Sequence, residues 1–250
     1  MKGKLHTHGD LERALFELDV HSKLVHPNLL PFLGGEETAD SVIIITPLAR
    51  GDLNSMSMNK VFAEDNCRRL CRQLLRGLEH LHGQGLVHCD IKPQNVLLFP
   101  SSANKYIAKI CDFGFTERIG PDGLIRSGGM RGSLGYFSPE QLKRLPYGQP
   151  VDMFALGIMT YTLLCGYEPF YPANKAGFLT GDATKDSKLL VFEAPYWDGV
   201  SQEAKSFLRG LLHGDPGQRL TAAQALADEW FQLPAGTPST GGEDADIQFE

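Results

Sequence analysis

The chain has 250 residues, with 24 Lys or Arg, 30 Asp or Glu, a formal net charge of −6 and 42% hydrophobic residues. This apolar content is enough for the core of one globular domain. The acidic balance argues against a nucleic-acid partner, because a phosphate backbone is bound by clustered excess Lys and Arg. The densest apolar run, Val42–Ile45, is far shorter than the roughly 20 residues that span a bilayer, so no membrane partner is expected either.

The cysteine pattern is typical of a reducing compartment. The cysteines are odd in number and form no C-x-x-C pair; they are Cys67, Cys71, Cys89, Cys111 and Cys165. Residues 1–8 contain no apolar stretch of the kind that a secretory signal requires. We therefore predict free thiols packed as small apolar groups, and a cytoplasmic location with the nucleus left open.

In chain order, the first predicted element is an amphipathic helix over residues 11–24, which ends before Pro27 because proline disfavours helix in the preceding residue. Strands are predicted at 29–33 and 41–46. The glycine-rich stretch between them, 34–37, is predicted as a turn.

The clearest predicted helix covers residues 63–82, where Leu and Cys recur at steps of three and four. Its arginines lie largely opposite this face and are interpreted as solvated; they are Arg68, Arg69, Arg72 and Arg76.

The second half of the chain is predicted to hold one strand pair and then helices. The strands are 96–99 and 106–111, with a polar turn at 100–104, and the helices are 151–165, 202–212 and 222–231. Residues 234–250 are small, polar and acidic, and are predicted to be a disordered tail. Strands that precede helices indicate an α+β fold.

Two polar loops carry the candidate chemistry. One is H-C-D-I-K-P-Q-N at residues 88–95, and the other is the D-F-G that begins at Asp112. Phosphoryl transfer from a metal-bound nucleotide needs two carboxylates, an amide and a cation. Asp90 would orient the attacking hydroxyl, and Lys92 would offset charge on the phosphoryl group. Asp112 and Asn95 would hold Mg²⁺, although each residue taken singly could instead cap or bond a turn.

These loops, together with three further segments, resemble the motifs of the eukaryotic protein kinases. H-C-D-x-K-x-x-N is similar to the catalytic loop H-R-D-x-K-x-x-N, and D-F-G to the kinase D-F-G. The further segments are S-P-E at 138–140, similar to A-P-E; V-D-M-F-A-L-G at 151–157, similar to V-D-x-W-S-x-G; and D-P-G-Q-R-L-T at 215–221, similar to D-P-x-x-R-x-T. The resemblance runs from Leu11 to Phe231 and implies a two-lobed kinase fold.

The resemblance also implies a division of the chain. Residues 1–48 would be a partial N-lobe with a helix, two strands and a hinge. Residues 49–233 would be a mainly helical C-lobe with the catalytic and activation loops, followed by the acidic tail at 234–250.

Nucleotide-binding roles follow from the match. Glu17 corresponds to the helix glutamate that pairs with a nucleotide-binding lysine, the alternative being a surface carboxylate. Ile45 corresponds to the gatekeeper, Thr46 and Leu48 belong to a hinge whose backbone would bond adenine, and Leu97 would lie beneath the adenine ring. Each of these could equally be plain core or turn. ATP and Mg²⁺ are the implied ligands.

The C-lobe match implies further roles. Ser133, in G-S-L-G-Y, would supply a hydroxyl that bridges Asp90 and Lys92. Asp152 would bond the catalytic-loop backbone, and Glu140 with Arg219 would form a buried ion pair. The remaining structural positions of the motifs are His88, Phe113 and Gly114.

The resemblance also indicates a subclass. Asp-x-Lys at Lys92 resembles the serine/threonine kinases, so a protein Ser or Thr hydroxyl is the implied substrate. Residues 163–171 and 194–197 look like the calcium/calmodulin-dependent kinase group. No basic amphipathic helix follows Phe231, so calmodulin binding is not expected.

Departures from the family pattern favour a second hypothesis. No G-x-G-x-x-G is present, and the only lysines before the predicted first helix are Lys2 and Lys4, so the N-lobe sheet is expected to be truncated. The alternative is therefore a pseudokinase or interaction scaffold, with a small-molecule phosphotransferase as a third reading. Cys89 replaces the usual arginine and cannot pair with a phosphorylated loop. His21 stands where the family prefers an apolar residue.

Overall fold

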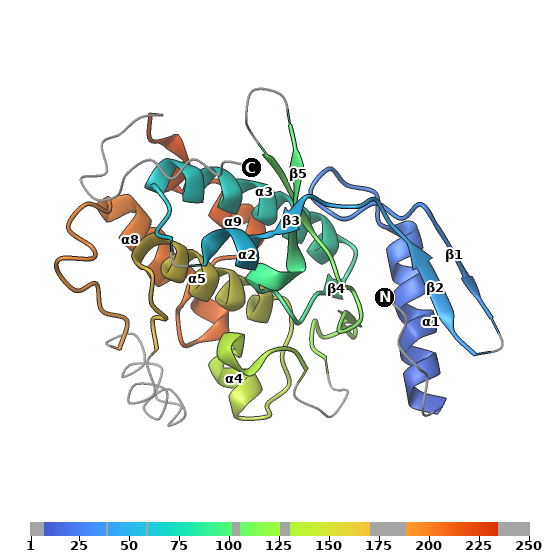
Figure 1. Cartoon of the computed structure of the whole chain (residues 1–250). Helices are drawn as coiled ribbons and strands as arrows, with labels where there is room; N and C mark the ends of the chain where they lie inside the picture. Colours follow the sequence, from blue (N-terminus) through green and yellow to red (C-terminus); the bar gives the residue numbers. More distant parts are fainter. Residues whose placement is uncertain are drawn as a thin grey trace.

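The structure, a computed structural model, describes residues 8–38, 40–58, 60–101, 106–125, 131–170 and 189–234. Figure 1 shows α1, β1 and β2 at one end of the molecule and the main helices gathered at the other. The fold mixes helices and strands as predicted. The predicted tail after Pro234, the candidate lysines Lys2 and Lys4, and most of the predicted turn at 100–104 lie outside the described residues.

All the described strands lie before residue 119, and the described elements after it are helices. The α-helices are α1 (His8–Lys23), α2 (Leu53–Ser57), α3 (Glu64–Gly83), α4 (Pro139–Leu142), α5 (Pro150–Cys165), α8 (Gln202–Leu211) and α9 (Ala222–Leu226). The 3-10 helices are η1 (Pro93–Asn95), η2 (Leu134–Tyr136), η3 (Pro216–Gln218) and η4 (Glu229–Gln232). The strands are β1 (Gly34–Glu37), β2 (Val42–Ile45), β3 (Gly51–Asp52), β4 (Leu86–Val87), β5 (Val96–Pro100), β6 (Tyr106–Ile110) and β7 (Glu117–Arg118).

The first strand lies later in the chain than predicted. The glycine-rich stretch is strand β1, antiparallel to β2 from Gly34↔Ile45 to Glu37↔Val42, so both the strand at 29–33 and the turn at 34–37 were wrong. A Cβ on Gly35 would lie 2.6 Å from the Ile43 carbonyl oxygen and 2.7 Å from a methyl of Leu18. Glycine is therefore needed inside this strand because the backbone lies so close to its neighbours.

The core sits between α3 and the helices that cover it. The apolar face of α3 is fully buried, and α5, α9 and β6 pack against it. The interpretation of its arginines as solvated was wrong for Arg68, which is 7% exposed. Arg68 donates to the carbonyl oxygens of Trp230 and Leu233 at 3.2 and 3.0 Å. These arginine bonds therefore satisfy carbonyl groups at the end of η4.

The last predicted helix is also divided in two. α9 ends at Leu226, and η4 begins after Asp228, whose carboxylate accepts the Trp230 N–H at 2.9 Å. An aspartate in this position competes with a continuous helix by capping the next turn.

All five cysteines are buried and free, which confirms the predicted packing of the thiols. Among the described residues, none of the helices combines the length and apolarity that a bilayer crossing needs.

Candidate active site

The β5–β6 hairpin brings the two polar loops together. The strands pair antiparallel from Val96↔Ile110, and the Cys111 N–H donates to the Asn95 carbonyl oxygen at 3.0 Å. The catalytic-type loop precedes β5 and the D-F-G segment follows β6. The two loops therefore meet at one end of the hairpin.

Asp90 is the centre of a small polar network. It is 2% exposed, and its Oδ2 accepts from Lys92 Nζ at 2.7 Å and from Asn95 Nδ2 at 2.9 Å. Lys92 Nζ also lies 2.8 Å from Ser133 Oγ, so Lys92 joins Ser133 to Asp90. The other carboxylate oxygen, Oδ1, is buried without a hydrogen-bond partner in the described part of the chain. Such an orphan acceptor is costly unless a ligand fills it.

Asp152 holds the backbone of this loop. Its Oδ1 accepts the Cys89 N–H at 2.8 Å and its Oδ2 accepts the His88 N–H at 2.9 Å. His82 Nε2 also lies 2.9 Å from Oδ2. Cys89 has a φ of 67°, in the left-handed region that non-glycine residues seldom adopt. The Asp152 carboxylate therefore compensates a strained backbone directly before Asp90.

A column of rings connects α1 to the catalytic loop. Phe113 is fully buried, with its ring centroid 4.8 Å from that of His21 and 5.7 Å from that of His88. His88 Nδ1 accepts the Asp90 N–H at 3.2 Å, which leaves Nε2 to donate to the Cys111 carbonyl oxygen at 3.1 Å. His21 Nε2 lies 2.8 Å from the Leu30 carbonyl oxygen. Burial lowers the pKa of His21 and outweighs this bond, which acts in the opposite direction.

A cavity of about 550 Å³ opens beside the two loops. Part of its lining is apolar and part is carboxylate, amide and hydroxyl; the lining residues are Asp10, Ala14, Glu17, His21, Leu30, Val42, Ile44, Thr46, Gln94, Asn95, Leu97, Cys111 and Asp112. Glu17, Thr46, Leu97, Asn95 and Asp112 thus lie together, as their predicted roles require.

Two of the predicted nucleotide-site residues do not line this cavity. Ile45 is 53% exposed and Leu48 is 97% exposed. Side chains alternate along a strand, so Val42, Ile44 and Thr46 share the face that borders the cavity, and Ile45 points the other way. Ile44, and not Ile45, therefore borders the cavity.

Glu17 has a different environment from the one predicted. No lysine or arginine borders the cavity in the part of the chain that the structure describes. Glu17 instead lies beside the D-F-G segment: its Oε2 would be 3.2 Å from a Cβ built on Gly114. Burial and then the negative charge of Asp112 raise the pKa of Glu17, and a hydrogen bond from the Phe113 backbone opposes them.

The oxygen atoms at this end of the cavity suit a magnesium ion. The NH₂ group of Asn95 donates to the carbonyl oxygen and a carboxylate oxygen of Asp90, so the amide oxygen of Asn95 remains as an acceptor. Asp112 lines the same cavity with a carboxylate, and its Oδ1 accepts a long bond of 3.3 Å from the Gly114 N–H. Mg²⁺ prefers one or two such oxygen ligands, completed by water and substrate phosphates.

The predicted ion pair is present in the helical part. Arg219 NH1 and NH2 donate to the two carboxylate oxygens of Glu140 at 2.7 and 3.1 Å, and both residues are buried. NH1 also donates to the Pro150 carbonyl oxygen, and the guanidinium lies 4.9 Å from the Phe154 ring centroid. The pair therefore joins α4 to α5 with its charges compensated.

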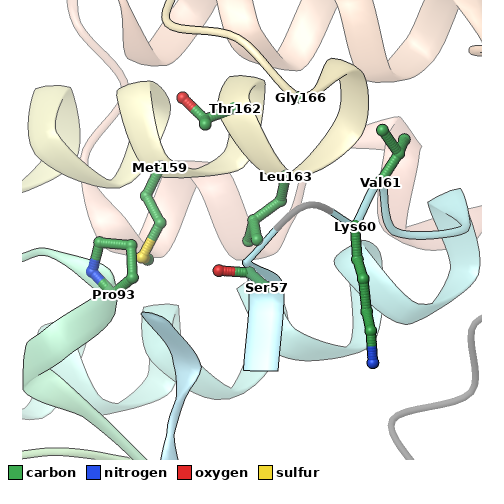
Figure 2. A pocket seen from close by; sticks show the side chains of 8 residues that line it. All are labelled: Ser57, Lys60, Val61, Pro93, Met159, Thr162, Leu163 and Gly166. Atoms are coloured by element: carbon green, nitrogen blue, oxygen red, sulfur yellow. The ribbon is translucent and has the colours of Figure 1, made fainter. Parts of the chain in front are cut away.

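A second hollow, of about 420 Å³, lies between α2, the catalytic-type loop and α5. Figure 2 shows Leu163 of α5 pointing toward Ser57 and Met159 of α5 pointing toward Pro93, with the Lys60 side chain extending outward. Met159 and Leu163 are almost fully buried, so this hollow has a closed apolar floor.

Some residues of the main cavity were not found from the sequence. Asp10 and Ala14 line it two turns and one turn before Glu17, and His21 follows one turn after Glu17. The i, i+4, i+7, i+11 spacing of these residues along α1 is the signal that could have identified them. His82, which contacts Asp152, had no motif to indicate its role.

The two polar loops and the cavity beside them have the residue arrangement of a protein kinase site. The protein kinase domain family matches residues 2–231, and the chain belongs to this family. It is 33% identical over 223 residues to "Probable serine/threonine-protein kinase pXi" of Dictyostelium discoideum, covering 88% of this chain and 30% of that protein. It is 35% identical to "Calcium/calmodulin-dependent protein kinase cmkA" of Emericella nidulans, and the match covers 88% of this chain and 53% of that protein. It is also 35% identical to "Calcium/calmodulin-dependent protein kinase type 1" of Macrobrachium nipponense, and the match covers 86% of this chain and 61% of that protein.

The chain thus spans between 30% and 61% of the length of these relatives. Their names confirm the resemblance to serine/threonine kinases and to the calmodulin-dependent group. The matched region is the kinase domain, and it includes both polar loops.

Proposed function

We propose that the chain transfers the γ-phosphoryl group of ATP to a serine or threonine hydroxyl of a protein. The observation that carries this proposal is the buried Asp90, with one oxygen held by Lys92 and Asn95 and the other left without a partner. The orphan Oδ1 is the acceptor for the substrate hydroxyl. As the new O–P bond forms and the bond to the ADP oxygen breaks, Asp90 takes the hydroxyl proton.

Lys92 and Ser133 have positioning and electrostatic roles in this reaction. Lys92 lies between Asp90 and Ser133, where its charge offsets that of the phosphoryl group in transit. Asn95 and Asp112 hold Mg²⁺, which neutralises phosphate charge when bound. Val42, Ile44 and Leu97 provide an apolar wall for adenine, next to Thr46 of the hinge.

A pseudokinase is the competing function, and one observation favours it. Glu17 lies against the D-F-G segment with no cationic side chain on the cavity wall in the described ranges, whereas active members of the family pair this glutamate with a lysine. The complete set of Asp90, Lys92, Asn95 and Asp112 supports the active form.

Protein substrates are proposed on the same basis, because the relatives' names include protein kinases. Two of those names state a calmodulin dependence. Residues 232–250 contain no Lys or Arg, so no calmodulin-binding segment is proposed for them. The buried free thiols support a reducing intracellular location.

The deciding experiment is a phosphotransfer assay with labelled ATP, Mg²⁺ and a Ser/Thr peptide library. We expect transfer by the wild-type chain and a loss of about 100-fold or more in Asp90→Asn. A thermal-shift measurement with Mg·ATP accompanies it, because a ligand that binds only the native state raises its melting temperature. A melting temperature that does not rise, together with equal activity of Asp90→Asn, would refute the kinase proposal.

A further inference from the structure

A group of basic side chains gathers where the turn after α1 meets α3 and β6. The His26 ring stacks on the His80 ring of α3, with the ring centroids 5.1 Å apart and the planes inclined by 22°. Arg76 lies one turn before His80 on the same helix. Lys109 of β6 donates to the carbonyl oxygen of Pro27, the residue that follows His26. We name His26, His80, Arg76 and Lys109 the basic cluster.

Hydrogen bonds fix the turn that carries His26. The Asn28 N–H donates to His26 Nδ1 at 3.1 Å, so the proton of the neutral imidazole is on Nε2. The Asn28 side chain donates to Gln73 Oε1 of α3 at 3.2 Å and to the Ala108 carbonyl oxygen of β6 at 3.0 Å. The fold therefore holds His26 in place before any ligand binds, which reduces the ordering cost of binding.

The charged groups that act on the pKa of His26 are all cations in the part of the chain that the structure describes. Burial, and then the charges of His80, Lys109 and Arg76, lower the pKa of His26. Burial also lowers the pKa of Lys109. Arg76 is exposed and the other three side chains are partly exposed, so a ligand can reach them. In a chain with a net charge of −6, the basic cluster is therefore a local region of positive potential.

A phosphate group matches these donors in charge and in shape. A phosphomonoester carries a charge of about −1.5 to −2 at pH 7, which the positive charges of Arg76 and Lys109 can balance. The donors come from a helix, a strand and a turn, and the several oxygens of a tetrahedral phosphate can accept from all three. A planar carboxylate offers only two oxygens. An arginine fork and a lysine ammonium are also the side chains that commonly bind phosphate.

We propose that the basic cluster binds a phosphate group, with Arg76 and Lys109 as charged donors and His26 as a neutral N–H donor. The bound phosphate joins α3 to the turn after α1. None of the four residues lines the cavity beside the two polar loops. The phosphate site is therefore separate from the proposed catalytic site, and its occupation does not depend on phosphotransfer by the chain.

The test uses two probes, inorganic phosphate and a short glycine peptide with one central phosphoserine. Each probe is titrated into the full chain without nucleotide or Mg²⁺, and the histidine ring resonances are followed by NMR at constant ionic strength, because salt screens exposed charges. We expect saturable shifts at His26 and His80. Tighter binding of the peptide identifies a phosphorylated protein segment as the ligand, and equal or weaker binding identifies free phosphate; either result supports the site.

Variants that remove one charge test which side chains bind the phosphate. In Arg76→Gln and in Lys109→Gln we expect the Kd for phosphate to rise about tenfold or more, since each variant loses a charge-assisted hydrogen bond. The matched control is Lys60→Gln, which removes the same charge from an exposed lysine beside α2. Its Kd should stay within about twofold of the wild-type value.

The absence of saturable shifts at both histidines with both probes overturns the proposal. A Kd that changes no more in Arg76→Gln than in Lys60→Gln overturns it as well. Arg76 is exposed, so we expect Arg76→Gln to fold. If Lys109→Gln does not fold, as judged by circular dichroism, Arg76→Gln decides alone. The titrations measure no phosphotransfer, so an inactive chain refutes the kinase function and leaves the outcome for the phosphate site unaffected.

Discussion

Replacing Asp152 by Asn removes one acceptor from a buried carboxylate on which several donors converge. Oδ1 accepts the Cys89 N–H, and Oδ2 accepts the His88 N–H and faces His82 Nε2, all at 2.8 to 2.9 Å. The asparagine amide has one acceptor oxygen and one donor NH₂ group. In either orientation the NH₂ group meets a backbone N–H, so at least one buried N–H loses its partner.

The magnitude follows from two terms. A buried donor left without a partner costs about 1–3 kcal/mol. The left-handed backbone of Cys89 carries a further cost of about 1–2 kcal/mol, which the bond to Asp152 compensates. We therefore expect the free energy of unfolding to fall by about 2–5 kcal/mol in Asp152→Asn. Asp152→Ala should lose more, because it removes both oxygens and leaves a cavity.

The assay is urea unfolding followed by circular dichroism, with the midpoint and slope read separately. The control is Asp198→Ala, which removes an exposed carboxylate and should stay within about 0.5 kcal/mol of the wild type. The kcat of Asp152→Asn should fall as well, since Asp90 follows the released backbone. A wild-type midpoint and slope in Asp152→Asn would refute this account of the catalytic loop.

Further predictions concern α1, α3 and the buried ion pair. The pKa of Glu17 is raised in the folded state, so its contribution to stability is lost as the pH rises from 4.5 through the folded pKa. Glu17→Gln should therefore raise the melting temperature at pH 7 and leave it nearly unchanged at pH 4. Equal shifts of the melting temperature at both pH values would contradict this. Arg68→Ala should lower the free energy of unfolding, measured in urea, by about 2–4 kcal/mol. The control Arg76→Ala changes an exposed arginine of the same helix and should lower it by less than about 0.5 kcal/mol. Similar losses in the two variants would show that the bonds from Arg68 to carbonyl groups are unimportant. Arg219→Met leaves the buried Glu140 carboxylate without its partner and should lower the free energy of unfolding by about 3–5 kcal/mol. Adding Glu140→Leu should recover a large part of this loss in a double-mutant cycle. Additive losses would be inconsistent with a coupled pair.

Periodicity was sufficient for the long helices. Leucines and cysteines at steps of three and four predicted α3 at nearly its observed bounds, Glu64–Gly83. The order of the motifs predicted that Asp90, Lys92 and Asn95 would lie near Asp112, because both loops border one hairpin. These features depend on local sequence, so a single chain reveals them.

Features that depend on the approach of distant segments were missed. A pair of glycines normally indicates a turn, but Gly35 is inside a strand because Ile43 and Leu18 leave no room for a side chain. Arg68 is buried by carbonyl groups more than 160 positions later in the chain, which no window along α3 could include. The side of β2 that borders the cavity carries Val42, Ile44 and Thr46, and the sequence could not fix this side because a shift of one residue reverses it.

The part of the site around Asp90 and the part around Glu17 and Asp112 differ in whether their charged groups have bonding partners in the chain. Around Asp90 each charge has a partner within the described residues except the one oxygen proposed to meet substrate. Around Glu17 the environment is different: burial, and then the negative charge of Asp112, raise the pKa of Glu17. A divalent cation that binds near both would lower that pKa again, because opposite charge favours the ionised carboxylate. We therefore expect the binding of a metal–nucleotide beside these carboxylates to be linked to the protonation of Glu17 on α1.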